Sequence, residues 1–219
     1  MIKVIITGAS GMVGEGVLLE CIRHPEVESI VVVGRRPCGV VHQKVKELLI
    51  PDFFALNSIE SELRGFDACF FCLGVSSIGL KEPEYTKLTY DLTMNFARLV
   101  SKLNNNMTFC YVSGASTDSS EKGRSMWARV KGRTENELMR LPFKQALAFR
   151  PGIMHPTPGM KNTLSYYKYV GWIWYLGRPF SPSVFLRLSE VGTAMINAVI
   201  RGSEKKVLET KDIYALSTK

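Results

Sequence analysis

The 219-residue sequence has few cysteines, no long hydrophobic run and no secretion signal at its start. Its five cysteines are an odd number at low density, which argues against a small scaffold held together by disulfides. A chain of this length buries enough surface to fold without such cross-links. No stretch of about eighteen apolar residues occurs, so we expect no transmembrane helix. The first ten residues lack the basic region, apolar stretch and cleavage site of a signal peptide, and we therefore expect a cytoplasmic protein.

Cys69 and Cys72 form a CxxC pair inside an apolar run that we predict to be a buried strand. Residues three apart on a strand point to opposite faces of the sheet. Two such thiols cannot bind one metal ion while the strand stays regular, so we expect buried thiols and no metal site.

Basic residues outnumber acidic ones, 28 Lys and Arg against 20 Asp and Glu, for a net charge of +8. They are spread along the chain with only modest clusters at 122–133 and 205–211, and no nucleic-acid-binding motif accompanies them. We therefore expect the positive charge to serve a phosphate-bearing cofactor and expect no nucleic-acid partner.

Strands and helices alternate along the chain. Apolar, β-branched runs predict strands at 3–7, 30–33, 45–50, 67–73, 108–112 and 146–149. Helical spacing predicts helices at 12–23, 59–63, 85–104, 127–141 and 189–200, the last one capped by Ser189. The connection over 35–44 is too short for a crossover helix. This order predicts an α/β fold, a Rossmann-type doubly wound parallel sheet in one domain over residues 1–219, with a small C-terminal lid region.

A glycine-rich turn, TGASGMVG, lies between the first predicted strand and the first helix. Gly8 permits the tight turn, Gly11 lets the backbone approach a diphosphate, and Gly14 lets the helix pack closely on the strand. The start of the helix offers unpaired N–H groups and a positive dipole end to phosphates. The turn therefore predicts a dinucleotide site built from Gly8, Ser10, Gly11, Met12, Val13 and Gly14.

Two arginines follow the second predicted strand, where a site that prefers NAD usually carries an acidic residue for the ribose 2′-hydroxyl. Arg35 and Arg36 match a 2′-phosphate in charge and geometry. We therefore expect a preference for NADP(H), with NAD(H) also accepted.

These residues resemble the short-chain dehydrogenase/reductase superfamily, most closely its atypical and extended branch near the Tat-interacting-protein-like and NmrA-like NAD(P)H-binding proteins. The resemblance covers nearly the whole chain in order. It implies that Asp52 and Phe53 border the adenine and that Leu73 and Gly74 pass beside the ribose. It also places a catalytic serine at Ser113, Ala115 or Ser116, a lysine of the YxxxK motif at Lys131, and contacts to the nicotinamide carboxamide at Pro151 and Ile153.

One position departs from the family pattern. Where the family has its proton-transferring tyrosine, this sequence has Trp127, whose indole does not ionise usefully near neutral pH. Lys131 remains suited to hold the nicotinamide ribose. If the chain is catalytic, another acid must replace the tyrosine, and we would test His155 first because a histidine side chain can transfer a proton near neutral pH. Tyr85, Tyr166 and Tyr167 are weaker candidates.

Residues 154–188 follow the last predicted strand and should cover the ligand-binding edge of the sheet as a lid or substrate-side insertion. Within them, 166–176 is rich in aromatic residues but too short to span a bilayer. Three interpretations stay open for it: a lid over an apolar substrate, an oligomer contact, or a weak contact with a membrane surface. The small-molecule substrate is not identified by the sequence.

Two functions follow from this sequence. The first is an NADP-dependent oxidoreductase or epimerase-like enzyme without the usual tyrosine. The alternative is a non-catalytic NADPH-binding redox sensor or regulatory protein. Trp127 favours the alternative, whereas Lys131 and the segment around Pro151 favour the enzyme.

Overall fold

The computed structural model describes residues 1–163, 174–181 and 183–218, and its centre is a seven-stranded sheet. The strands lie in the order β3-β2-β1-β4-β5-β6-β9, and every neighbouring pair is parallel. Their bounds are β1 Ile2–Thr7, β2 Val27–Gly34, β3 Val45–Leu49, β4 Ala68–Phe71, β5 Thr108–Val112, β6 Gln145–Arg150 and β9 Val207–Glu209. Strands β2 and β3 lie on one side of β1, and β4, β5, β6 and β9 follow one another on its other side. The predicted Rossmann-type doubly wound sheet is therefore confirmed.

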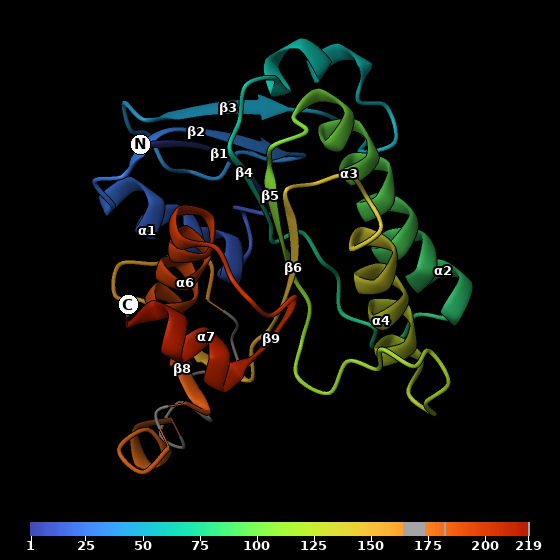
Figure 1. Ribbon diagram of the computed structural model, residues 1–219, viewed down its shortest axis with the longest axis vertical. Coiled ribbons are helices and arrows are strands. Elements are labelled where there is room, and N and C mark those ends of the chain that lie inside the picture. Colours follow the sequence, from blue (N-terminus) through green and yellow to red (C-terminus); the bar gives the residue numbers. More distant parts are fainter. Residues whose placement is uncertain (164–173, 182, 219) are drawn as a thin grey trace.

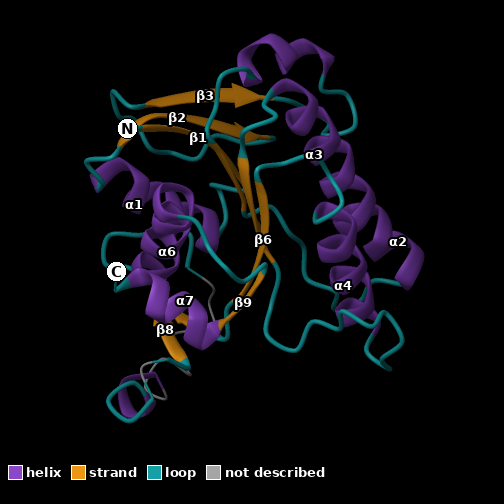
Figure 2. Cartoon of the chain, viewed as in Figure 1, coloured by secondary structure: helices purple, strands orange, loops and turns teal. Residues whose placement is uncertain are grey.

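Helices cover both faces of this sheet (Figures 1 and 2). One face carries α1 (Met12–Arg23), α6 (Leu188–Arg201) and α7 (Thr210–Ser217), and the other carries α2 (Glu82–Thr86), α3 (Leu92–Leu103) and α4 (Met126–Leu138). Alternate residues of β1 enter the two resulting cores: Val4 and Ile6 pack with α1 and α6, whereas Ile5 packs with α3. A sheet buried on both faces requires such apolar strands.

The CxxC thiols separate between the two cores. Cys69 lies in the core beside α3, and Cys72 packs against the core beside α1. Burial raises the pKa of Cys69, which disfavours the thiolate that metal and redox chemistry need. Among the described residues, no three potential metal ligands gather in one place.

Two helix starts differ from the sequence-based expectation. The helix expected from Tyr85 begins at Glu82, with Pro83 in its first turn, and passes through a π-helical turn at Lys87–Asp91 before α3. Ser189 is not an N-cap: α6 begins one residue earlier, and the Glu190 carboxylate accepts from the Arg187 amide at 2.7 Å. Arg187 is the N-cap, and Glu190 at the third helical position accepts from its backbone amide, as the acidic residue of a capping box does.

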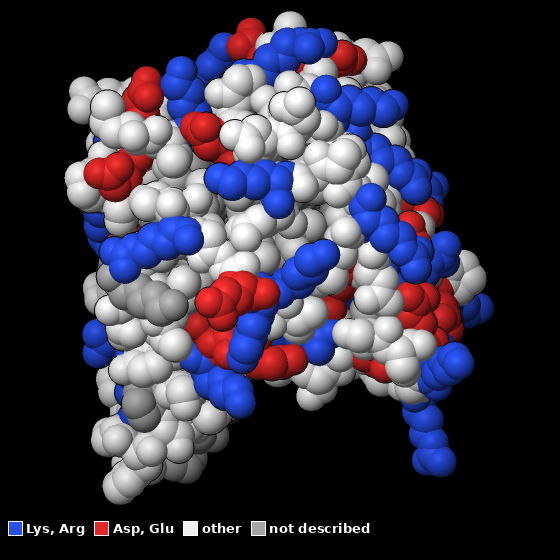
Figure 3. Space-filling model, viewed as in Figure 1, with Lys and Arg blue, Asp and Glu red and all other residues white. Residues whose placement is uncertain are grey.

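Short elements complete the fold. A 3-10 helix, Asn57–Leu63, follows β3, and a separate parallel pair is formed by β7 (Ile153–His155) and β8 (Phe185–Arg187). Over the part of the chain that the structure describes, no helix is both long enough and apolar enough to cross a membrane. On the face seen in Figure 3, acidic side chains interrupt the basic ones, so the positive charge does not form one continuous patch there.

Candidate functional site

The carboxyl ends of the parallel strands bring the predicted site residues to one edge of the sheet. Gly8 follows β1, Arg35 follows β2, Leu73 follows β4, Ser113 follows β5 and Pro151 follows β6. This edge, where the strand order reverses between β1 and β4, is where open α/β sheets bind ligands.

Two glycines hold the turn after β1 in a shape that no other residue could adopt. Gly8 has φ +73°, and a Cβ there would lie 2.7 Å from backbone atoms of Cys72 and Leu73. A Cβ on Gly14 would lie only 2.2 Å from the Gly8 carbonyl oxygen. The first turn of α1 therefore rests directly on the loop, and the loop rests on the end of β4.

The start of α1 has no side-chain cap within the described residues. Gly11 is the N-cap and makes no side-chain capping hydrogen bond. The side chain of Met12 is buried and that of Val13 packs against the core, so both residues present only backbone to this edge. The Ser10 hydroxyl makes no hydrogen bond within the described part of the chain. The exposed Gly11 backbone and the uncapped amides can accept an anionic group.

Arg35 and Arg36 are exposed at the end of β2, and neither makes an ion pair within the described ranges. Asp52 is also exposed, and its carboxylate accepts from the Phe54 amide at 2.9 Å. Phe53 differs from its neighbours because its ring is 1% exposed and packs against Phe96 in the core. Phe53 can therefore offer a ligand only its backbone.

The Lys131 side chain extends from α4 to the loop that follows β5. Its ammonium donates to the Ser113 carbonyl oxygen at 3.1 Å and lies 5.5 Å from the centre of the Tyr111 ring. Burial lowers the pKa of Lys131 to about 8, and the charge of Glu135 partly opposes this effect. The group is therefore a charged donor at neutral pH that loses its proton readily.

Ser113 and Lys131 lie together, and within the described residues no hydrogen bond joins Ser116 to either of them. The Ser113 hydroxyl is buried and lies 2.9 Å from the Thr117 hydroxyl, which donates to the Gly114 carbonyl oxygen at 2.8 Å. Because Thr117 has only one proton to donate, Ser113 donates to Thr117 and keeps its lone pairs. Ser116 is exposed with φ 68°, a left-handed backbone that costs a non-glycine residue about 1–3 kcal/mol.

Trp127 lies beside the same loop, since a Cβ on Gly114 would come within 3.9 Å of its ring. Leu73 is half-buried, its amide donating to the Thr7 hydroxyl at 3.3 Å, and Gly74 next to it is exposed. Pro151 is buried and Ile153 is 45% exposed at the start of β7.

His155 belongs to a different cluster. Its ring lies 4.3 Å from the ring of Trp174 and 5.2 Å from that of Tyr175. Within the described ranges, no contact joins it to Lys131 or Ser113. Tyr85 is 2% exposed in the core, while Tyr166, Tyr167 and the rest of 166–173 lie outside the described residues.

Glu15 is a candidate site residue that the sequence did not single out. It lies in the first turn of α1, is 2% exposed, and its two carboxylate oxygens accept from the amides of Lys161 and Asn162, each at 2.7 Å. It therefore ties the segment after β7 to the start of α1. An acidic residue in a first helical turn is so common that nothing in the sequence singled it out.

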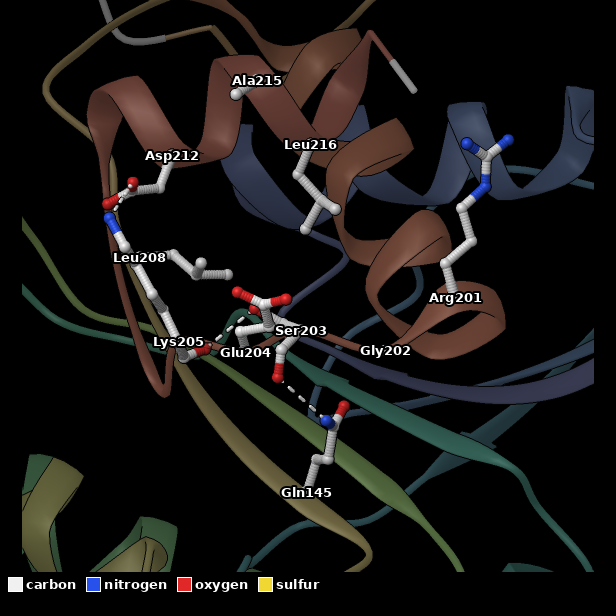
Figure 4. Close-up of a pocket in the computed structure, with 10 residues that line it drawn as sticks. All are labelled: Gln145, Arg201, Gly202, Ser203, Glu204, Lys205, Leu208, Asp212, Ala215 and Leu216. Carbon is white, nitrogen blue, oxygen red and sulfur yellow. Dashed lines mark hydrogen bonds and ion pairs between the residues drawn. The ribbon is translucent and has the colours of Figure 1, made fainter.

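A cavity of about 560 Å³ lies at the opposite edge, beside Gln145 at the start of β6 (Figure 4). Lys205 pairs with Asp212 at 2.6 Å across it, and the Gln145 amide donates to the Ser203 carbonyl oxygen at 3.1 Å. This cavity is not part of the site at the carboxyl edge.

No protein-family model matches the chain. Among curated proteins it resembles Protein HTATIP2 of Rattus norvegicus, with 26% identity over 69% of this chain and 62% of the rat protein. It also resembles Protein FMP52-1, mitochondrial, of Scheffersomyces stipitis, with 26% identity over 91% of this chain and 89% of that protein. The first of these matches therefore spans less than two thirds of its relative.

Two solved structures share the fold of this chain. MoeE5, solved in complex with UDP-glucuronic acid and NAD, superposes with a TM-score of 0.69 and 17% identity over 95% of this chain and 76% of its own. The ADP-L-glycero-D-manno-heptose-6-epimerase of Helicobacter pylori gives a TM-score of 0.69 and 15% identity over 99% of this chain and 81% of its own. These likenesses support the fold.

The expectation of a cytoplasmic protein is wrong in the light of these relatives. Several of them carry names that place them in mitochondria, which points away from a purely cytoplasmic location. That expectation came from the pattern of the first ten residues, which does not distinguish the cytosol from an organelle.

Proposed function

We propose that this chain, which resembles HTATIP2 and the FMP52 proteins, is an atypical member of the short-chain dehydrogenase/reductase superfamily that binds NADP(H) and acts as an oxidoreductase or epimerase-like protein of low carbonyl activity. The observation that carries the proposal is the turn after β1. Gly8 and Gly14 let the start of α1 pack closely on the end of the sheet, and Gly11, the N-cap, makes no side-chain capping hydrogen bond, so the first amides of α1 can donate to a diphosphate. The NAD named with MoeE5 supports the same class of cofactor.

In this proposal the candidate cofactor-binding residues have the following roles. Gly8, Ser10, Gly11, Met12, Val13 and Gly14 cradle the diphosphate, and Arg35 and Arg36 hold the 2′-phosphate. The backbone at Asp52 and Phe53 borders the adenine, and Leu73 and Gly74 pass beside the ribose. Lys131 would donate to the nicotinamide ribose, and Pro151 and Ile153 would lie beside the carboxamide. The bound cofactor would supply hydride transfer.

The arginines can be tested directly. A charge-assisted contact contributes about 1.5–3 kcal/mol, so Arg35→Ala and Arg36→Ala should each lower NADPH affinity by roughly 10- to 150-fold and leave NADH affinity nearly unchanged. Fluorescence titration measures both cofactors. Arg98→Ala, an exposed change on α3, is the matched control and should bind as the native protein does. Equal, millimolar affinity of the native protein for NADPH and NADH would remove the proposal.

Trp127 limits the chemistry. Its indole N–H can donate a hydrogen bond to a reacting oxygen but cannot supply a proton near neutral pH. Ser113 keeps its lone pairs but uses its proton toward Thr117. We therefore expect Trp127→Tyr to raise the rate of NADPH-dependent reduction of a simple aromatic aldehyde, and Trp127→Phe, the matched control, not to raise it. A native protein that already reduces the aldehyde as fast as the tyrosine variant would overturn this part.

A non-catalytic NADPH sensor is the second candidate, and Trp127 is the observation that favours it. If Trp127→Tyr binds NADPH normally and still reduces no carbonyl compound, the sensor explains the chain better than the enzyme.

We also propose that residues 154–188 form the substrate side of one Rossmann domain over 1–219. Glu15 supports this, because it holds the Lys161 and Asn162 amides beside the cofactor helix.

A further inference from the structure

A second cavity, of about 350 Å³, lies on the substrate side of the chain, apart from the glycine-rich turn. It lies between the loop after β7, the turn that begins at Trp174 and the start of α6. The lining residues used below are His155, Thr157, Trp174, Tyr175, Arg187 and Ser189. Cavities of roughly 300–1,000 Å³ are the size that small molecules occupy.

Several polar groups around this cavity lack a protein partner. The Thr157 hydroxyl oxygen is buried and makes no hydrogen bond. Over the ranges that the structure describes, the Ser189 hydroxyl also makes none. The Nδ1 of His155 lies 2.9 Å from the Pro156 carbonyl oxygen, which can only accept, so Nδ1 carries the proton and Nε2 remains for a ligand. A buried polar group without a partner is rare, so the Thr157 hydroxyl indicates a missing ligand or water, and the half-buried Ser189 and His155 offer further polar groups to the same ligand.

The cavity also carries an unbalanced positive charge. The Arg187 guanidinium lies 5.8 Å from the centre of the Trp174 ring and makes no ion pair within the described part of the chain. The neighbouring carboxylate, Glu190, is already engaged by Arg178 and by the Arg187 backbone amide. Ser189 lies in the first turn of α6, where the helix dipole is positive. The electrostatics therefore favour an anion.

Aromatic side chains supply an apolar wall. Trp174 is 5% exposed, and its indole N–H donates to the Leu186 carbonyl oxygen at 3.1 Å, which fixes the ring. Tyr175 packs edge-on against Trp174 at 5.3 Å and is 62% exposed, so part of its ring is free for contact.

We propose that this cavity binds a small organic acid, in which a phosphate or carboxylate group lies among Arg187, Ser189 and Thr157 and an attached ring lies against Tyr175 and His155. The inference stands on the cavity alone and does not require that the chain bind a dinucleotide.

Phenyl phosphate and benzoate are the acidic probes, and benzyl alcohol is the neutral probe of similar size. The chain has three tryptophans, so a ¹H–¹⁵N spectrum shows few indole signals, and Trp174→Phe assigns the one at the cavity. We expect phenyl phosphate, benzoate or both to shift the Trp174 indole signal saturably, and benzyl alcohol to bind at least about tenfold more weakly. Inorganic phosphate alone shows how much of the affinity comes from the anion.

Arg187→Gln should weaken binding of the acidic probe by about tenfold or more, because it removes the charge but keeps donors. Thr157→Val should weaken it less, and Arg98→Gln, on α3, is the matched control. No saturable shift with either acid, equal affinity for benzyl alcohol, or unchanged binding in Arg187→Gln would overturn the inference.

The titrations are run without NADPH and in Gly14→Ala as well as in the native protein. Binding of the acids by both proteins, with no NADPH binding by the native protein, would sink the proposed cofactor site and leave the second site standing. The reverse result would sink only the second site.

Discussion

Lys131 offers the sharpest test, because the ammonium group that would hold the cofactor also weakens the folded protein. Burial lowers the pKa of Lys131 from 10.5 to about 8. Between these two values the unfolded chain holds a proton that the folded chain has lost. Folding stability from this group therefore rises as the pH increases from about 8 to 10.5, and it is at its lowest below pH 8.

The size of the effect follows from the same pKa change. At about 1.4 kcal/mol for each factor of ten in proton affinity, the ceiling is about 3.5 kcal/mol over the whole window. Lys131 is only partly buried, so water still screens its charge, and we expect about 1–2 kcal/mol.

The assay compares urea unfolding of the native protein and Lys131→Met at pH 7 and pH 10. In the difference between their free energies of unfolding, the titration of all other groups cancels. We expect this difference, native minus variant, to increase by about 1–2 kcal/mol from pH 7 to pH 10. Lys102→Met, an exposed change on α3, is the control for losing one lysine charge.

Cofactor affinity should move in the opposite direction. The charged form binds the ribose, so NADPH affinity of the native protein should fall as the pH rises through about 8, while Lys131→Met binds more weakly without that step. A stability difference that stays flat or falls between pH 7 and pH 10 would refute the burial argument for Lys131.

Two further predictions concern the start of α1. Gly14→Ala places a Cβ 2.2 Å from the Gly8 carbonyl oxygen, so α1 must move off the turn. We expect a loss of about 2–4 kcal/mol in urea unfolding, against about 0.5 kcal/mol or less for Gly74→Ala, whose Cβ would meet nothing within 4 Å. In Glu15→Gln an NH₂ group replaces one of the two carboxylate oxygens that accept from the Lys161 and Asn162 amides, so two donors face each other. We expect this to lower the free energy of unfolding by about 1–3 kcal/mol. Hydrogen exchange over 156–163 should become faster in Glu15→Gln and not in Glu20→Gln on the same helix; equal exchange in both would show that Glu15 does not hold this segment.

The sequence by itself determined the parallel sheet and the place of its ligand edge. Apolar strand runs and helical spacing are local patterns, and they predicted six of the seven sheet strands and the loop after β2. The glycines of the first turn were also readable, because a tight turn and a close helix leave no room for a side chain at Gly8 or Gly14. The strands β7, β8 and β9 have three residues each, which is too short for a periodic pattern to predict them.

Only the tertiary structure decided which side chains meet. The Phe53 ring lies in the core because it packs against Phe96. Glu15 accepts hydrogen bonds from backbone amides about 146 residues further along the chain. His155 lies against Trp174 and not beside Lys131. Such contacts depend on how distant segments pack, and pairs far apart in sequence leave no local pattern that could predict them.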